Sequence, residues 1–213
     1  MGKSSKRLKQ MLFIGNSFTA RNDLLGLISQ LASAHGIEIK HRLLSIGGAS
    51  LRTHWNKGEA RSAIQSGMFD YIVLQEQSTL PIKNASRMRE NVLLFAEEIR
   101  AARGQAVLYM TWARKPMPEK QKLISESYES VGREIGAIVV PAGNVWWRFI
   151  AKHKSPALHD KDQSHPTLAG SYLAACVFLK TMFDKSPVGI ESKLSGLGAK
   201  EVHALQRAAD VNL

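Results

Sequence analysis

Three residues from opposite ends of the chain, Ser17, Asp162 and His165, have side chains that together could activate a nucleophile. Ser17 lies in GNSFT at residues 15–19, and the other two lie in DQSHP at residues 162–166. A serine hydroxyl is a poor nucleophile at neutral pH, so it needs a base within hydrogen-bonding reach, and the base needs a third group that fixes its tautomer. The three residue types therefore predict acyl transfer through a covalent serine intermediate, provided that the fold brings them together.

Each of these residues also has an ordinary structural explanation. A lone serine after a strand most often caps a helix, Asp162 suits a turn, and His165 suits a helix entry because Pro166 pushes the preceding backbone out of the helical region. Asp160 is a second candidate for the carboxylate that orients the histidine. His159, Asp160, Asp162 and His165 also include metal-ligand types. No second cluster with metal-site spacing occurs in the sequence, so we expect neither a metal nor a cofactor.

The composition is that of an ordinary globular protein. The 213 residues suit one domain with a substantial core, and the 44% hydrophobic and 22% charged contents are typical values. We expect a flexible basic tail at residues 1–10 and a single domain at residues 11–213. The net charge of +11 would suit a module that binds an acidic surface. A surface-binding module is supported by the charge alone. Because the sequence contains no nucleic-acid motif, we do not expect nucleic acid as a partner.

The cysteine content and the N-terminal sequence bear on the compartment. The single cysteine, Cys176, cannot form an internal disulfide, which fits a reducing environment. The apolar run at residues 11–14 is too short for a signal-peptide core or a membrane span. We therefore expect a cytoplasmic protein without a membrane partner, unless the true start lies upstream. The oligomeric state is not predicted.

Short apolar strands alternate with longer helices along the chain. The expected strands lie at 11–14, 37–44, 71–74, 105–110 and 137–140. The expected helices lie at 24–31 (capped by Asn22 or Asp23), 52–66, 87–103, 118–136, 144–152, 166–183 and 199–209. This alternation predicts a parallel sheet covered on both faces, with its chemistry beyond the carboxyl ends of the strands. Ser17, Gly48 and residues 75–77 each follow a predicted strand.

The two terminal segments resemble the first and last blocks of the SGNH (GDSL-type) hydrolases, a family of esterases and lipases. FIGNSFT at residues 13–19 is similar to the family's Gly-Asp-Ser-Leu block, and DQSHPT at residues 162–167 is similar to its Asp-x-x-His block. SIGGASL at residues 45–51 contains the candidate glycine of the second block. The resemblance runs from about Met11 to Phe183 and implies a flavodoxin-like α/β/α fold with a five-stranded parallel sheet.

The third block departs from the family pattern. The family has Gly-x-Asn, whereas this chain has LQEQS at residues 74–78, which resembles a bacterial branch with glutamines there. The resemblance implies an oxyanion hole built from the N–H groups of Ser17 and Gly48 and a side-chain amide. Gln75 or Gln77 could supply that amide. Gln77 is favoured because Gln75 is expected to end the strand, although both would lie on one side if the strand continues.

The resemblance implies a serine esterase that cleaves carboxylic esters, with Ser17, His165 and Asp162 as the triad. Short acyl groups such as acetyl, on a small molecule or a carbohydrate, are the expected substrates. The four tryptophans could flank a sugar site or fill the core: Trp55, Trp112, Trp146 and Trp147. Because the third block is altered, the alternative is a non-catalytic binding protein with the same fold.

Overall fold

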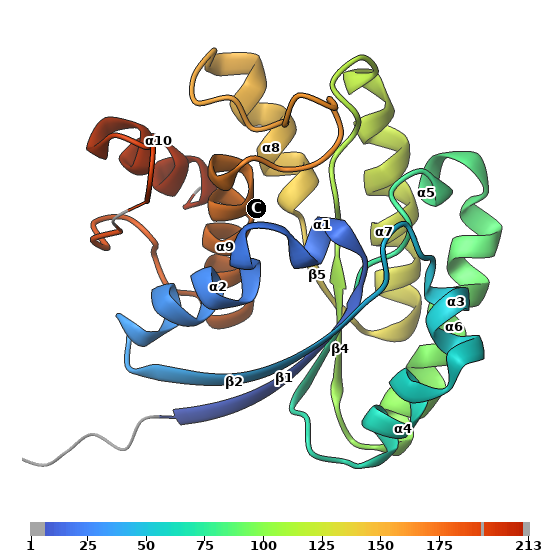
Figure 1. The fold of residues 1–213 in the computed structure, drawn as a ribbon. Helices are drawn as coiled ribbons and strands as arrows, with labels where there is room; N and C mark the ends of the chain where they lie inside the picture. The colour runs from blue at the N-terminus through green and yellow to red at the C-terminus, as the bar shows by residue number, and fades with distance from the viewer. Residues whose placement is uncertain (1–6, 193, 211–213) are drawn as a thin grey trace, which may run out of the picture.

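Five parallel strands form one sheet at the centre of the molecule (Figure 1). The computed structural model describes residues 7–192 and 194–210. The order across the sheet is β2-β1-β3-β4-β5. The strands are β1 (Arg7–Gly15), β2 (Ile37–Ser45), β3 (Tyr71–Leu74), β4 (Gln105–Tyr109) and β5 (Ile138–Val140). This is the flavodoxin-like order, and it confirms the predicted five-stranded parallel sheet.

The sheet is buried on both faces because its strands carry apolar side chains in both directions. Alternate residues of a strand point to opposite faces. Met11 and Phe13 of β1 belong to one buried cluster, whereas Leu12 and Ile14 belong to the other. A continuous apolar run is what a parallel strand covered on both sides requires.

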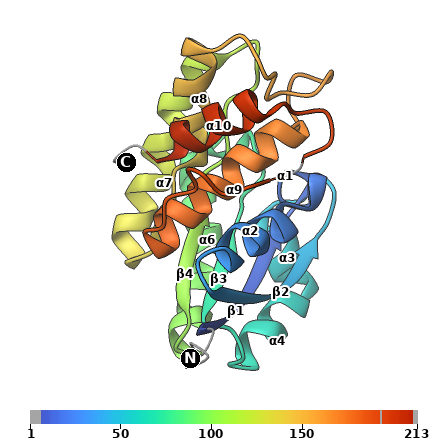
Figure 2. The same cartoon turned by 90° about the vertical axis from the view of Figure 1, so that its left-hand side faces the viewer.

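Helices cover each face, which confirms the three-layer α/β/α class (Figures 1 and 2). The first layer contains α2 (Leu24–Ser33), α8 (Ala142–Lys152), α9 (Leu168–Phe183) and α10 (Ala199–Ala209). The second contains α3 (Leu51–Lys57), α4 (Glu59–Gln65), α6 (Ala85–Ala101) and α7 (Gln121–Ile135), with α5 (Leu80–Lys83) packed on α6 and α7. Residues 17–20 form the short helix α1, and 3-10 turns lie at 21–23 and 118–120.

Helix α9 is the most deeply buried helix of the first layer. Every residue from 169 to 179 is buried, because α9 packs between the sheet and the helices α2, α8 and α10. The sequence predicts a helix beginning on Pro166, but α9 begins at Leu168. Thr167 is its N-cap, and its Oγ1 accepts the N–H of Gly170. Pro166 instead pairs with His159 in an isolated bridge.

Two larger differences from the prediction have a clear structural cause, whereas the remaining boundaries differ by at most three residues. Strand β1 begins at Arg7 rather than Met11, because residues 7–10 pair with residues 37–40 of β2. The predicted tail therefore includes four strand residues, and positions 1–6 lie outside the described residues. The predicted helix at 52–66 is broken into α3 and α4 at Gly58, whose φ of 78° is left-handed and caps α3.

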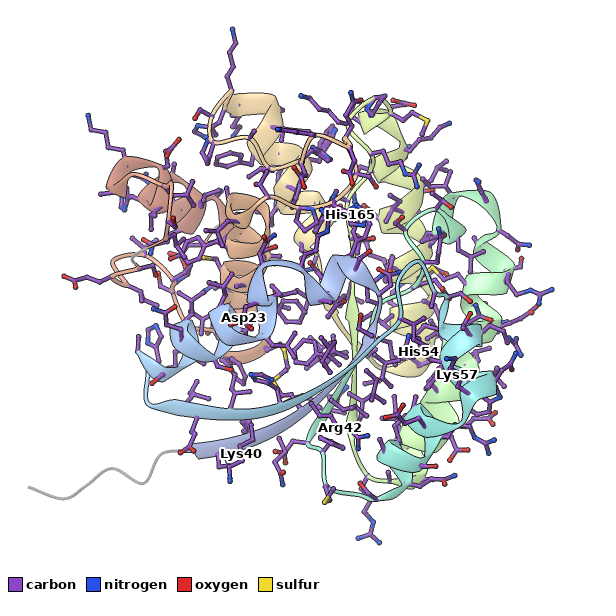
Figure 3. All side chains as sticks on the ribbon, in the orientation of Figure 1. Asp23, Lys40, Arg42, His54, Lys57 and His165 are labelled. Atoms are coloured by element: carbon purple, nitrogen blue, oxygen red, sulfur yellow. The ribbon has the colours of Figure 1, made fainter. Side chains whose placement is uncertain are left out.

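The sheet order places the reversal point of the topology between β1 and β3. The chain crosses from β1 to β2 on one side, and then returns past β1 to β3 on the other. Crevices form at the carboxyl ends of strands at such a point. Ser17 follows β1 and residues 75–77 follow β3, so both flank it. Figure 3 shows His165 near this end of the strands, while Lys40 and Arg42 lie on β2 away from it. Within the described residues, no helix is both long enough and apolar enough to cross a membrane.

Candidate active site

Ser17 lies on a sharp turn between β1 and α1. Asn16 is the N-cap of α1, and its Oδ1 accepts the N–H of Phe18 at 3.1 Å. Gly15 is required by a close approach, since a Cβ there would lie 2.7 Å from Gln75 Oε1 and 2.7 Å from Thr19 Oγ1. As the first residue of the helix, Ser17 has a backbone N–H without an intrahelical acceptor.

Gln75 holds this turn from β3. It is buried, and its Oε1 accepts the N–H of Asn16 at 2.9 Å and the hydroxyl of Thr19 at 3.0 Å. Its Nε2 donates to the carbonyl of Glu76. Both ends of the Gln75 amide are thus occupied within the fold, and its contacts are those of a support for the nucleophile turn.

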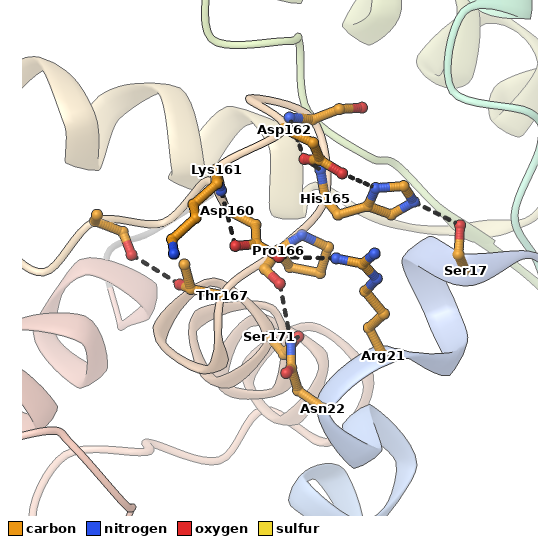
Figure 4. Close-up of polar contacts among 12 residues, drawn as sticks. Ser17, Arg21, Asn22, Asp160, Lys161, Asp162, His165, Pro166, Thr167 and Ser171 are labelled. Atoms are coloured by element: carbon orange, nitrogen blue, oxygen red, sulfur yellow. Dashed lines mark hydrogen bonds and ion pairs between the residues drawn. The ribbon is translucent and has the colours of Figure 1, made fainter.

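Ser17, His165 and Asp162 form a continuous hydrogen-bonded chain, as Figure 4 shows. Ser17 Oγ lies 2.7 Å from His165 Nε2, and His165 Nδ1 lies 2.5 Å from Asp162 Oδ2. A nucleophile, a base and an orienting carboxylate within such distances are the geometric signature of a triad. The structure therefore brings together the three residues that the sequence singled out.

Asp162 also fixes the loop that carries the histidine. Its Oδ1 accepts the N–H groups of Ser164 at 3.0 Å and His165 at 2.9 Å. The side-chain hydrogen bond from His165, aided by these backbone donors, holds the pKa of the Asp162 carboxyl well below its usual range. The carboxylate therefore stays charged at neutral pH, which its 45% exposed side chain also favours.

Neighbouring backbone bonds close this loop tightly. Asp160 N–H donates to the His165 carbonyl at 2.8 Å, and Gln163 N–H donates to the Asp160 carbonyl at 2.9 Å. Gln163 has a left-handed φ of 61°. Trp112 Nε1 donates to the Ser164 carbonyl at 3.0 Å, and Phe18 lies with its ring centroid 5.1 Å from that of His165. The position of the imidazole is therefore fixed by the loop at residues 160–165 and by the ring of Phe18.

The other acidic and imidazole groups nearby have different partners. The Asp160 carboxylate accepts from Arg21 Nη1 at 2.9 Å and from the Lys161 N–H at 2.8 Å, so the His165 imidazole is bonded to the Asp162 carboxylate and not to that of Asp160 (Figure 4). His159 is buried, with its Nε2 3.0 Å from the Ala113 carbonyl, and burial lowers its pKa. Among the described residues, no group of three or more His, Cys, Asp or Glu side chains converges as metal ligands do.

Gly48 and Gln77 lie in the two segments beside the turn that carries Ser17. Gly48 is exposed with a left-handed φ of 67°, which favours glycine. Asn16 Nδ2 donates to the Ala49 carbonyl at 3.0 Å and ties this loop to the nucleophile turn. Gln77 Oε1 accepts from the N–H groups of Thr79 and Leu80 at 2.9 and 3.0 Å. With its oxygen so engaged, the Gln77 amide directs its NH2 group away from those bonds.

Sequence reasoning missed the polar residues that hold these segments. Glu76 is fully buried and accepts from Leu51 and Gln77 backbone N–H groups and from Asn91. The available signal was a charged residue directly after a fully apolar strand, because buried charges are seldom left unpaired. His54 is buried, with its Nε2 2.7 Å from the Gly15 carbonyl, and burial lowers its pKa.

The tryptophans divide between the core and the surface. Trp112 and Trp146 are buried and stacked with their centroids 3.7 Å apart. Trp55 is partly buried in the opposite layer, and Trp147 is 48% exposed on α8. Only Trp112 is tied to the triad loop, through Ser164.

Several solved structures share the fold of this chain. A candidate SGNH hydrolase from Slackia heliotrinireducens is 26% identical, with a TM-score of 0.68 over 83% of this chain and 100% of the other. A DUF4886 family protein from Bacteroides uniformis is 19% identical, with a TM-score of 0.78 over 95% and 93% of the two chains. A variant of Axe2, an acetyl-xylooligosaccharide esterase from Geobacillus stearothermophilus, is 16% identical, with a TM-score of 0.68 over 89% and 100%.

No protein-family model and no curated protein matches this chain. The assignment therefore depends on the solved structures and on the sequence blocks around residues 17 and 162–165. The strand order of the sheet and the similarity to the Slackia structure both indicate the SGNH hydrolase fold. The chain has the fold of the SGNH (GDSL-type) hydrolases and is similar to the candidate SGNH hydrolase from Slackia heliotrinireducens.

Proposed function

We propose that this protein is a serine esterase that hydrolyses carboxylic esters by an acyl-enzyme mechanism. The observation that carries the proposal is the chain of contacts from Ser17 Oγ through His165 to Asp162, at 2.7 and 2.5 Å. Structures with the same fold include esterases and a lipase/acylhydrolase, which supports ester hydrolysis as the reaction class.

In the first step, Ser17 Oγ attacks the acyl carbon while its proton passes to His165 Nε2. Asp162 accepts from Nδ1, keeps Nε2 free to take the proton, and stabilises the imidazolium that forms. Collapse of the tetrahedral intermediate breaks the ester C–O bond, and the leaving alkoxide takes the proton from Nε2. Water then attacks the acyl carbon and gives one proton to His165 Nε2. Collapse of the second tetrahedral intermediate breaks the bond between Ser17 Oγ and the acyl carbon, His165 returns the proton to Ser17 Oγ, and the carboxylic acid leaves.

The tetrahedral intermediate carries an oxyanion that needs hydrogen-bond donors. We assign this role to the backbone N–H groups of Ser17 and Gly48 and to Nε2 of Gln77. The engaged oxygen of Gln77 supports this choice, because it leaves the NH2 group as the end available to a substrate. Both ends of the Gln75 amide are engaged, the oxygen by the Asn16 N–H and the Nε2 by the Glu76 carbonyl, which makes it the weaker candidate.

The proposed acyl group is short, with acetyl first. The exposure of Gly48 and Asp162 supports a site in which the ester is reached from the surface, so the alcohol can be large. The name of the similar Axe2 suggests an acetylated carbohydrate as the alcohol to test first.

Hydrolysis of p-nitrophenyl esters of increasing chain length tests the proposal. We expect turnover of the acetate that falls with chain length, and loss of this activity in Ser17→Ala with an unchanged circular dichroism spectrum. Ser62→Ala is the matched control, since Ser62 lies on α4 with its hydroxyl on the Gly58 carbonyl. Equal activity of Ser17→Ala and the wild type would refute the assignment. No activity in the wild type would favour a non-catalytic binding protein.

A further inference from the structure

Glu76 is a fully buried acidic residue that lies between the two segments beside Ser17. Its Oε1 accepts the N–H of Leu51 at 3.0 Å and the N–H of Gln77 at 2.7 Å. Its Oε2 accepts from Asn91 Nδ2 at 2.8 Å. Removing a carboxylate from water is costly unless donors satisfy it. The N–H groups of Leu51 and Gln77 and the Asn91 amide satisfy the Glu76 carboxylate.

One carboxylate oxygen joins the second and third sequence blocks. Leu51 is the first residue of α3 and lies three residues after Gly48. Gln77 carries the side-chain amide of the third block. Because both backbone N–H groups bond to the same Oε1, the Gly48 loop and the Gln77 segment cannot shift independently without losing a charge-assisted hydrogen bond.

The orientation of Asn91 is fixed from outside. Its Oδ1 accepts from Arg52 Nε at 3.0 Å, so its Nδ2 is the end that faces Glu76. Burial raises the pKa of Glu76, whereas the donors from Asn91, Gln77 and Leu51 and the charge of Arg52 oppose that rise. Arg52 thus donates to Asn91, and Asn91 donates to the buried Glu76 carboxylate.

We propose that Glu76 is the positioning residue of the oxyanion hole and sets the separation of the Gly48 and Gln77 donors without touching the substrate. This inference rests on the proposed function. The donors must lie where the oxyanion forms, and a displacement of about 1 Å can lower a rate by about 10²-fold. A purely structural Glu76 would affect the stability of the fold and leave the turnover of the folded enzyme unchanged.

The test exchanges the polarity of the Glu76–Asn91 pair. Glu76→Gln keeps an acceptor oxygen for Leu51 and Gln77 but places an NH2 group against Asn91 Nδ2. The double variant Glu76→Gln/Asn91→Asp restores a donor opposite an acceptor and keeps an acceptor for Arg52. It is therefore expected to fold even if the single variant does not. Glu98→Gln is the control, because Glu98 lies on the same helix as Asn91 and pairs with Arg61.

We expect Glu76→Gln to lower kcat by about tenfold to 10²-fold with little change in KM, because the donors act mainly in the transition state. The double variant should recover at least about tenfold of this loss. Amide NMR signals of Gly48 and Gln77 should shift in the single variant and return in the double variant. Glu98→Gln should match the wild type in both measurements.

Two results would overturn the proposal. One is a folded Glu76→Gln enzyme with wild-type kcat, and the other is a double variant that folds and shows no recovery of kcat or of the NMR signals. The proposed function fails in a different way, through absence of esterase activity in the wild type. In that case the NMR comparison still reports whether Glu76 couples the two segments.

Discussion

Replacing Asp162 by asparagine should leave the fold intact and remove most of the catalytic power. The Asp162 Oδ1 bonds to the Ser164 and His165 N–H groups can persist through the amide oxygen. The NH2 group then faces His165 Nδ1, where Oδ2 now lies at 2.5 Å. An amide donor favours the tautomer with the proton on Nε2, and that tautomer cannot accept the proton of Ser17.

The size of this effect can be estimated from a known triad and from the exposure of Asp162. In one well-studied serine protease, the same substitution lowers turnover by about 10⁴-fold. Asp162 is 45% exposed, so water can partly replace its role, and we expect a loss of about 10²- to 10⁴-fold. At about 1.36 kcal/mol per decade, this is about 3–5 kcal/mol of transition-state stabilisation. Initial rates with p-nitrophenyl acetate under saturating conditions measure it.

Asp160→Asn is the matched control, because the same change occurs two residues away in the same loop. The Asp160 carboxylate pairs with Arg21 and makes no hydrogen bond to the His165 imidazole, and an exposed pair of this kind contributes at most about 1 kcal/mol to stability. Its turnover should therefore stay close to that of the wild type. Equal losses in Asp160→Asn and Asp162→Asn, or a larger loss in Asp160→Asn, would refute the assignment of the orienting carboxylate.

Three further predictions concern the same site. Gln77→Ala should lower kcat by about 10²- to 10³-fold with a smaller effect on KM, the loss typical of one oxyanion donor, and a loss below tenfold in steady-state kinetics would exclude the side-chain donor. Gln75→Ala should instead lower the free energy of unfolding by about 1–3 kcal/mol, because it leaves the buried Asn16 N–H without its acceptor, and urea denaturation showing no destabilisation would contradict this role. The wild type should be more stable than Asp162→Asn above about pH 4, the pKa of an unfolded aspartate. This difference in stability should shrink as the pH falls toward the lowered pKa of folded Asp162. Thermal melts in which the difference grows in acid would contradict stabilisation of the Asp162 carboxylate by its hydrogen bonds.

Much of the fold could be predicted because its strands and helices have strong local patterns. The strand at 71–74 and the helix at 199–209 were predicted with their observed boundaries. The errors lie where tertiary contacts override the local signal. Three of residues 7–10 are polar or basic, yet all four form strand because β2 provides them with parallel partners. Gly58 ends α3 within a pattern that otherwise continues as one helix.

The grouping of Ser17, Asp162 and His165 could be predicted because both segments resemble SGNH family blocks, whereas the residue types alone left Asp160 as a second candidate. The roles of the two glutamines could not be predicted, since Gln75 and Gln77 follow the same strand and differ only in their partners. The Glu76–Asn91 contact was also inaccessible, because α6 approaches the end of β3 through tertiary packing. A charged residue directly after a buried strand predicts a hydrogen-bond partner, but the sequence does not show which residue is the partner.

Covalent labelling with a fluorophosphonate tests the central claim most directly. The reagent reacts only with a serine that is activated by a base, and peptide mapping by mass spectrometry locates the adduct. We predict one adduct, on Ser17, that is absent from Ser17→Ala and forms much more slowly in Asp162→Asn. An unlabelled wild type, or an adduct on any other serine, would contradict the assignment of Ser17, His165 and Asp162 as a working triad.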